Sequence, residues 1–174
     1  MNRSERILEA WRSGKEPNKK DLLIEMSQGI KEICDNINNH LRVVKVHLIL
    51  CFIFGDNEKY KENLDHWVSE IAAAVTEVPY VKGKNKFPTY KQLKQRCLNT
   101  WSDSYDVKIN GFVNIACSQE HITDIPEYNG QSLVYCTIKY YEWLLQNLSD
   151  KGYVDNTEVK NEIEKLMDEY RLSL

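Results

Sequence analysis

The stretch from residue 22 to residue 54 constrains the fold more than any other part of the chain. Its apolar residues recur every three or four positions, close to the 3.6-residue turn of an α-helix, and so share one face. These residues are Leu22, Met26, Ile30, Ile33, Ile37, Leu41, Val44, Leu48 and Cys51. Within residues 41–54 only Arg42, Lys45 and His47 are polar. A helix that is apolar nearly all round is buried on several sides, so we expect the second half of this helix to be the axis of a bundle.

A second amphipathic segment follows directly after Gly55. Its apolar residues again have helical spacing, and the helix must stop before Pro79, because proline disfavours helical backbone in the preceding residue. These residues are Tyr60, Leu64, Trp67, Ile71, Val75 and Val78. A short joint between two long helices makes them antiparallel neighbours, so the sequence predicts a long antiparallel helical hairpin.

The rest of the chain also shows mainly helical patterns. We expect a first helix capped by Ser4 and ended by Gly14, another beginning at Thr89, one over about 132–152, and a last one capped by Thr157. With the helical hairpin, this predicts a mainly α, single-domain bundle of five or six helices over residues 1–174.

Two places leave alternatives open. Asn36, Asn38 and Asn39 allow a kink or a break in the long helix, because asparagine side chains compete for backbone hydrogen bonds. At 107–115, Asn110-Gly111 lies between two short stretches of alternating apolar residues, which is typical of a small β-hairpin. A helical loop is the alternative, because an isolated two-stranded hairpin is only marginally stable in water.

Composition limits the classes of function. The chain of 174 residues can bury a core without disulfide or metal staples, and its formal charge of −3 argues against a generally basic nucleic-acid binder. Five widely spaced cysteines without a CxxC pair indicate buried, reduced thiols. The N-terminus is charged, and the longest apolar run, residues 48–54, is too short to cross a bilayer. We therefore expect a soluble cytoplasmic protein without a membrane partner.

An arginine and a histidine on the long helix form the sharpest short motif. The string Arg42-Val43-Val44-Lys45-Val46-His47 resembles the Arg-x4–6-His motif of HEPN ribonucleases, which are also small helical bundles. The resemblance implies that His47 acts as the base on the RNA 2′-hydroxyl, that Arg42 stabilises phosphate charge, and that two protomers share one cleft. The alternative is a partly buried histidine and an arginine whose stem lies along a packed helix.

Charge is unevenly distributed along the chain. No acid lies between Glu77 and Asp103, whereas that segment holds six bases interleaved with aromatic residues, a pattern that can bind the backbone and bases of RNA. The bases are Lys82, Lys84, Lys86, Lys91, Lys94 and Arg96. A solvated surface is the alternative interpretation.

The region after this segment is acidic and contains aromatic residues. Acids beside exposed aromatic rings suit the capture of a basic protein, because complementary charge speeds association and excludes wrong partners. The candidate partner-binding residues are Asp103, Asp106, Glu120, Asp124, Glu127 and Tyr128. An ordinary acidic surface loop is the alternative.

Motifs of common enzymes are missing from the sequence. It has no glycine-rich phosphate loop, GxSxG or HExxH, and the nearest approach to a metal site, Glu62 with His66, has no third ligand. We therefore predict no metal and no cofactor, and these absences favour a non-enzymatic protein over an enzyme. The predicted function is that of a small binding protein, such as an immunity protein or antitoxin that inhibits a basic toxin or nuclease. The alternative is a HEPN-like ribonuclease or an RNA-binding adaptor.

Overall fold

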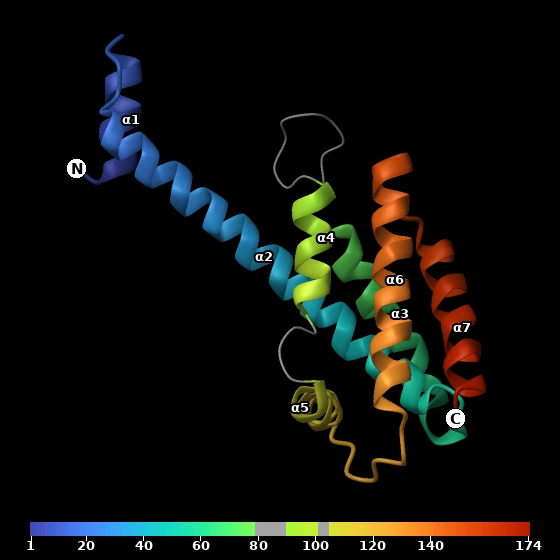
Figure 1. Ribbon diagram of the computed structural model, residues 1–174. Helices are drawn as coiled ribbons and strands as arrows, with labels where there is room; N and C mark the ends of the chain where they lie inside the picture. Colours follow the sequence, from blue (N-terminus) through green and yellow to red (C-terminus); the bar gives the residue numbers. More distant parts are fainter. Residues whose placement is uncertain (79–89, 101–104) are drawn as a thin grey trace. The chain divides into compact units, whose positions relative to one another are not determined.

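The computed structural model describes residues 1–78, 90–100 and 105–174, and in these ranges the chain is helical (Figure 1). The mainly α prediction is confirmed. The elements in chain order are α1 (Arg3–Arg12), α2 (Lys19–Phe54), the short 3-10 helix η1 (Glu58–Tyr60), α3 (Lys61–Thr76), α4 (Tyr90–Asn99), α5 (Tyr105–Gln119), α6 (Gly130–Lys151) and α7 (Asn156–Leu172). Within the ranges described there are seven α-helices, one more than the upper number predicted.

The chain forms two compact units, Met1–Ile37 and Asn38–Leu174, which we call unit 1 and unit 2. The boundary lies inside α2, next to the asparagines at which the sequence allowed a break. The helix nevertheless continues through this point, because Lys19–Phe54 is one α-helix.

Unit 1 contains α1 and the first part of α2. Asn2, rather than the predicted Ser4, is the N-cap of α1, and its side chain forms a reciprocal capping box with Glu5. Gly14 follows the helix with φ of +69°, a left-handed conformation that glycine adopts without a Cβ clash. Two hydrogen bonds of 3.1 Å join the Arg6 guanidinium to the Asp21 carboxylate, and so α1 is tied to the start of α2.

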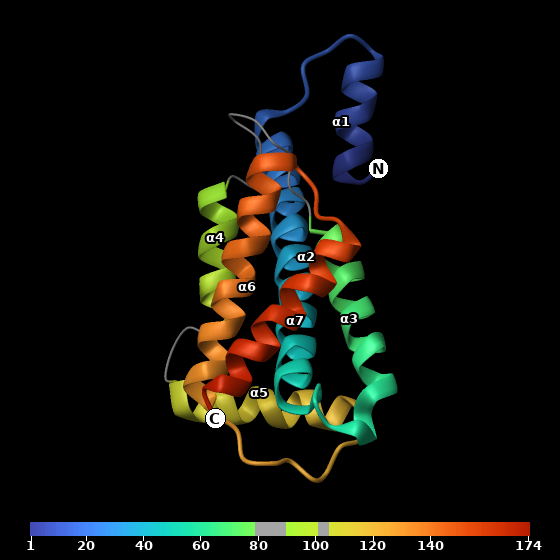
Figure 2. The ribbon, with the colours of Figure 1, turned by 90° about the vertical axis from the view of Figure 1, so that its right-hand side faces the viewer.

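Unit 2 packs around the second half of α2. Nearly all apolar residues of 41–54 are buried, as their pattern predicted. Helix α6 contacts α4, α5 and α7, and α7 also contacts α3. Figure 2 shows α3 on one side of α2 and α4 with α6 on the other, while α5 crosses the lower end. The buried Tyr141 hydroxyl donates to the Leu41 carbonyl at 2.8 Å, and this bond joins α6 to the core helix.

The connection from α2 to α3 is fixed by close packing. Phe54 lies 6.4 Å from Trp67 and 5.1 Å from Tyr60 between ring centroids, so the end of α2 contacts the start of α3. A Cβ at Gly55 would collide with the Met167 side chain and the Cys51 carbonyl. Only glycine therefore fits at this joint without a shift of the backbone at the end of α2.

The β-hairpin considered for 107–115 is wrong, because these residues lie inside α5. Ile109, Val113, Ala116 and Cys117 are all buried, and their spacing of four, three and one residues forms one face of a helix. The contact between α5 and α6 buries that face, which a hairpin without further strands could not do. Gly111 lies within the helix with open space around it, so its cost there is only the ordinary helix penalty of glycine.

The last helix also begins differently from the prediction. Asp155, not Thr157, is the N-cap of α7, and its side chain accepts a hydrogen bond from the Thr157 backbone at 2.8 Å. Helix α6 ends as expected at Gly152, whose φ is +81°.

Helix α2 is long and apolar enough to cross a membrane by length and composition alone. However, 67% of its most apolar window is buried inside the structure, as in the core helix of a soluble protein. The cytoplasmic location stays a prediction.

Candidate functional site

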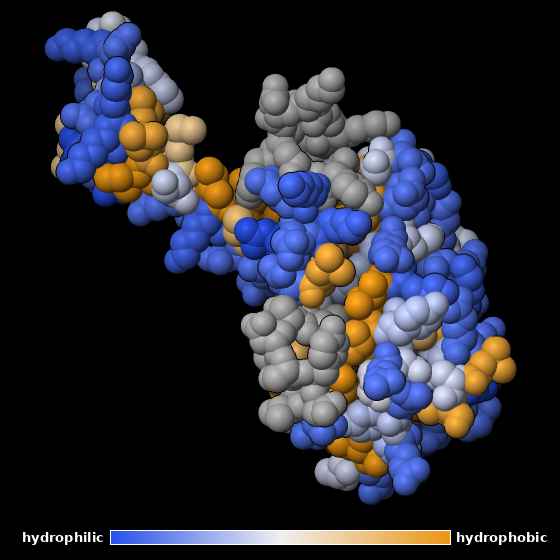
Figure 3. Space-filling model, in the orientation of Figure 1, coloured by the Kyte–Doolittle hydropathy of each residue, from blue (hydrophilic) through white to orange (hydrophobic). Residues whose placement is uncertain are grey.

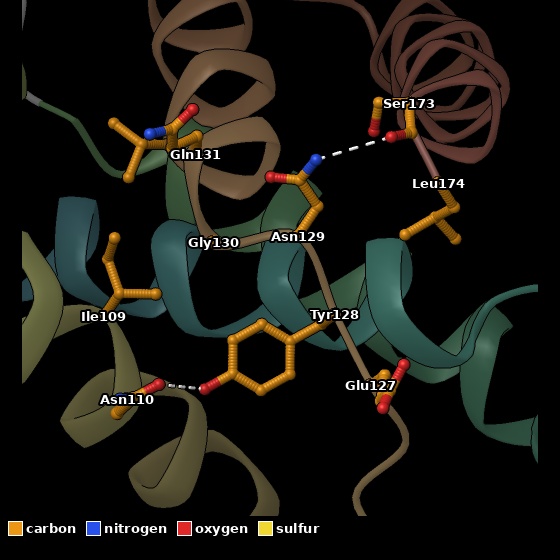
Figure 4. Close-up of a pocket in the computed structure, with 10 residues that line it drawn as sticks. Ile109, Asn110, Glu127, Tyr128, Asn129, Gly130, Gln131, Ser173 and Leu174 are labelled. Carbon is orange, nitrogen blue, oxygen red and sulfur yellow. Dashed lines mark hydrogen bonds between the residues drawn. The ribbon is translucent and has the colours of Figure 1, made fainter.

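A cavity of about 1080 Å³ lies in unit 2, where the start of α6 meets α5 and the end of α7. Figure 4 shows the residues that surround it. They are Ile109, Asn110, Glu127, Tyr128, Asn129, Gly130, Gln131, Val134, Ser173 and Leu174. Most of the polar ones come from the loop before α6 and from its first turn.

The loop from α5 to α6 has a defined course. At the end of α5 the Ile122 backbone donates to the Cys117 carbonyl at 2.9 Å, and His121 takes a left-handed conformation with φ of +55°. Histidine tolerates this conformation better than most residues, and the turn directs the buried Ile122 into the core. The following loop is thereby anchored at its first end.

Asn129 anchors the second end of the loop with three hydrogen bonds. Its side-chain oxygen caps α6 by accepting from the Ser132 backbone at 3.1 Å, and its side-chain nitrogen donates to the Ser173 carbonyl at 3.3 Å (Figure 4). Its backbone N–H donates to the Tyr170 hydroxyl at 3.2 Å. The start of α6 and the end of α7 are therefore held together at one wall of the cavity.

Tyr128 and Glu127 give the cavity its chemistry. The Tyr128 hydroxyl donates to the Asn110 side-chain oxygen, so its ring is held against α5 (Figure 4). Burial raises the pKa of Tyr128 above its ordinary value, so the phenol keeps the proton that it donates to Asn110 well above neutral pH. Glu127 is exposed and is the one carboxylate side chain among the lining residues. The cavity thus combines a negative charge, an aromatic ring and several amide groups.

The predicted partner-binding residues are only partly brought together. Glu127 and Tyr128 line the cavity, whereas Glu120 is half-buried and Asp124 exposed on the same loop. Asp106 belongs to α5, and Asp103 lies outside the described residues.

The sequence interpretation missed the amide groups of the cavity, Asn110, Asn129 and Gln131. Asn129 and Gly130 lie shortly before the buried Leu133 and Val134, an arrangement typical of an N-cap, whereas the apolar pattern predicted a helix only from about residue 132. The capping asparagine is therefore the sequence signal for a start of α6 at Gly130.

Arg42 and His47 occupy different sides of α2. Arg42 is exposed, whereas His47 is buried and donates from Nδ1 to the Val43 carbonyl of its own helix at 2.8 Å. Five residues turn a helix by 500°, which leaves the two side chains about 140° apart around the axis. The His47 ring meets the exposed His66 ring edge-on, with centroids 6.5 Å apart.

Lys45 is a buried charged residue to which the sequence analysis gave no role. Its Nζ donates to the Thr100 carbonyl at 2.8 Å and lies 3.1 Å from the centroid of the Phe112 ring. A buried ammonium group is costly unless it is compensated, and a carbonyl and an aromatic face both compensate it. Lys45 therefore ties α2 to the end of α4 and to α5.

The basic segment is described only at its end. Lys82, Lys84 and Lys86 lie outside the described residues, and Lys91 and Lys94 are exposed on α4. Arg96 is half-buried, and its Nη1 donates to the Asn38 side chain of α2 at 3.1 Å. At least one of the six predicted RNA-binding bases therefore has a role in packing.

The part of the chain that the structure describes contains four buried thiols and no candidate metal site. It contains no group of three potential metal-ligating side chains. Burial raises the pKa of Cys97 to about 12 and that of Cys136 to about 11, and it also raises the pKa values of Cys51 and Cys117. These thiols stay protonated and unreactive near pH 7.

Comparison with known proteins gives no relative: no protein-family model, no curated protein and no solved structure matches this chain.

Proposed function

We propose that this protein is a binding protein, of the immunity-protein or antitoxin kind, that inhibits a basic protein by taking one of its cationic side chains into the cavity at the start of α6. The observation that carries the proposal is that the Glu127 carboxylate and the Tyr128 ring line the same cavity.

The charge of this region favours a basic partner. Between Lys108 and Lys139 the chain has no lysine or arginine, but it has the acids Glu120, Asp124 and Glu127. All three lie on the loop that leads into the cavity. A negative loop beside a concave site attracts positive groups and raises their association rate.

The chemistry of the cavity suits an arginine better than other side chains. A guanidinium has five N–H donors, and the site offers acceptor oxygens on Glu127 and on the amides of Asn110 and Gln131. The face of the Tyr128 ring adds a surface on which a planar cation can stack. The volume is slightly above the usual range for small-ligand sites, so a side chain with part of its loop can enter.

The test is capture of the partner with matched variants. The site variant combines Glu120→Gln, Asp124→Asn and Glu127→Gln. The control combines Glu58→Gln, Glu62→Gln and Asp65→Asn, which remove three exposed acids near the start of α3. We expect wild type and control to retain one stoichiometric basic protein from native cells, and the site variant to lose it.

The same capture contains the result that would contradict the proposal. Retention of a basic protein by all three forms would place the interface elsewhere on the molecule. Co-purified RNA without a protein would instead favour the RNA-binding adaptor, whose binding should weaken when Lys82, Lys84 and Lys86 become glutamine.

The HEPN-like ribonuclease remains the alternative hypothesis, and it rests on Arg42 and His47. It requires His47→Ala to abolish RNA cleavage while helicity is unchanged. If His47 has only a structural role, the wild-type protein should not cleave RNA. The variant His47→Ala should then be less stable, because the substitution removes a buried ring and its bond to Val43.

A further inference from the structure

Unit 1 exposes large apolar side chains along the first part of α2. Leu23, Met26 and Ile30 are 65%, 62% and 46% exposed. Figure 3 shows hydrophobic surface on both helices of this unit. Scattered apolar residues on a surface are ordinary, but a contiguous row on one helix indicates an interaction site.

Helix α1 extends this exposed surface. Leu8 and Trp11 are also exposed, and together with Leu22 and Met26 they line a groove of about 420 Å³ between α1 and α2. The groove widens the apolar surface beyond a single row.

The spacing of the row indicates what binds there. Leu23, Met26, Ile30 and Ile33 are all exposed or half-buried, and they are separated by three, four and three residues. This is the a/d pattern of a heptad repeat, in which each apolar side chain packs into a hole formed by a second helix. Spacing and apolar composition thus favour a helix as the occupant of this row.

Charge favours a second copy over a foreign helix. Residues 1–37 contain seven bases and seven acids, so unit 1 has no net charge with which to attract a strongly charged partner. The positions beside the row carry no charge and do not repel their own copies. They are Leu22, Ser27, Gly29 and Cys34. No atom lies within 4 Å of a Cβ built at Gly29, so a second backbone can approach closely.

We propose that residues 22–34 of α2 form a two-fold seam at which a second copy of this chain binds through the same residues. An isologous contact requires a self-complementary surface, and a neutral heptad row is one. This inference is independent of the cavity in unit 2, since no residue of the seam lines it.

The test is the molar mass of the full-length protein in solution, measured by light scattering and sedimentation equilibrium over a range of concentrations. The seam variant is Ile30→Glu, and the control is Gln28→Glu, which adds the same charge to the same helix away from the row. We expect wild type and control to dimerise, and Ile30→Glu to raise the dimer dissociation constant by at least about tenfold, because a charge enters the seam from both copies.

A second variant keeps the test independent of folding. Leu23→Glu changes an exposed position and should weaken the dimer in the same way, while circular dichroism should show unchanged helicity for all variants. A wild-type protein that is monomeric at every concentration would overturn the proposal, as would a dimer that neither substitution weakens. A monomer that co-sediments with phosphatidylserine–phosphatidylcholine vesicles would also overturn it and assign the row to a lipid surface.

Discussion

The two parts of α2 have the same apolar period but different surroundings. In residues 41–54 apolar residues also occupy most of the positions between those of the repeat, and nearly all of these side chains are buried in unit 2. In residues 22–33 the same period is flanked by polar residues, and its members remain exposed or half-buried in unit 1. Periodicity therefore identifies the face of a helix that packs against another apolar surface. The residues on the other faces decide whether that surface belongs to the same chain.

The largest contrast between the two parts should appear when apolar side chains are truncated. Leu48→Ala removes a fully buried side chain and should lower the free energy of unfolding by about 2–5 kcal/mol, because it leaves a cavity that the core cannot fill. Met26→Ala should change it by less than about 0.5 kcal/mol at concentrations where the chain is monomeric, because that side chain is exposed. Chemical denaturation of both variants measures the difference, and equal losses would show that the row is covered within the monomer.

The parts of the fold that were predicted correctly depend on patterns local to each helix. The ends of α6 and α1 at Gly152 and Gly14 follow from the left-handed conformation that glycine accepts. Helix α5 could not be assigned, because Asn110-Gly111 is a strong local turn signal that burial of the opposite face against α6 outweighs.

The candidate site was predicted less well than the fold. Glu127 and Tyr128 were found because charge and aromaticity are visible in the sequence. Asn110 and Ser173 were not, because their place in the cavity depends on the contacts of α5 and α7 with the start of α6, which no local pattern encodes.

Glycine gives a second and smaller contrast between the two parts of the molecule. Gly55→Ala should lower the free energy of unfolding by about 1–3 kcal/mol, because the added Cβ collides with Met167 and with the Cys51 carbonyl. Gly29→Ala should raise it by about 0.5–1 kcal/mol, because this glycine lies inside a helix with nothing near it. Thermal denaturation of both variants tests the pair, and a tolerated Gly55→Ala would mean that the backbone at the end of α2 shifts to accept the added Cβ.

Capping of α1 should have a smaller effect. Asn2→Ala removes the side chain that accepts from Glu5 and should cost about 1 kcal/mol, felt in unit 1 alone. Asn2→Ser is the matched control, because serine can also cap a helix. Amide hydrogen exchange should become faster in α1 and stay unchanged in α6, and faster exchange in both would show that the two units unfold as one.

The smallest effect near neutral pH, and one that grows with alkalinity, should come from the buried thiols. A cysteine whose pKa is raised in the folded state contributes stability that is present below its unfolded pKa and is lost as the pH rises toward the folded value. For Cys136 and Cys97 the pKa values in the folded state are about 11 and about 12, so the melting temperature should be flat around pH 7 and fall above about pH 9.

A thiol reagent at pH 7.5 should modify the half-buried Cys34 of unit 1 first and reach the four buried cysteines of unit 2 only on unfolding. Rapid modification of all five thiols in the native protein would show that unit 2 opens as readily as unit 1, and the contrast between the two parts of α2 would then lie in packing alone and not in stability.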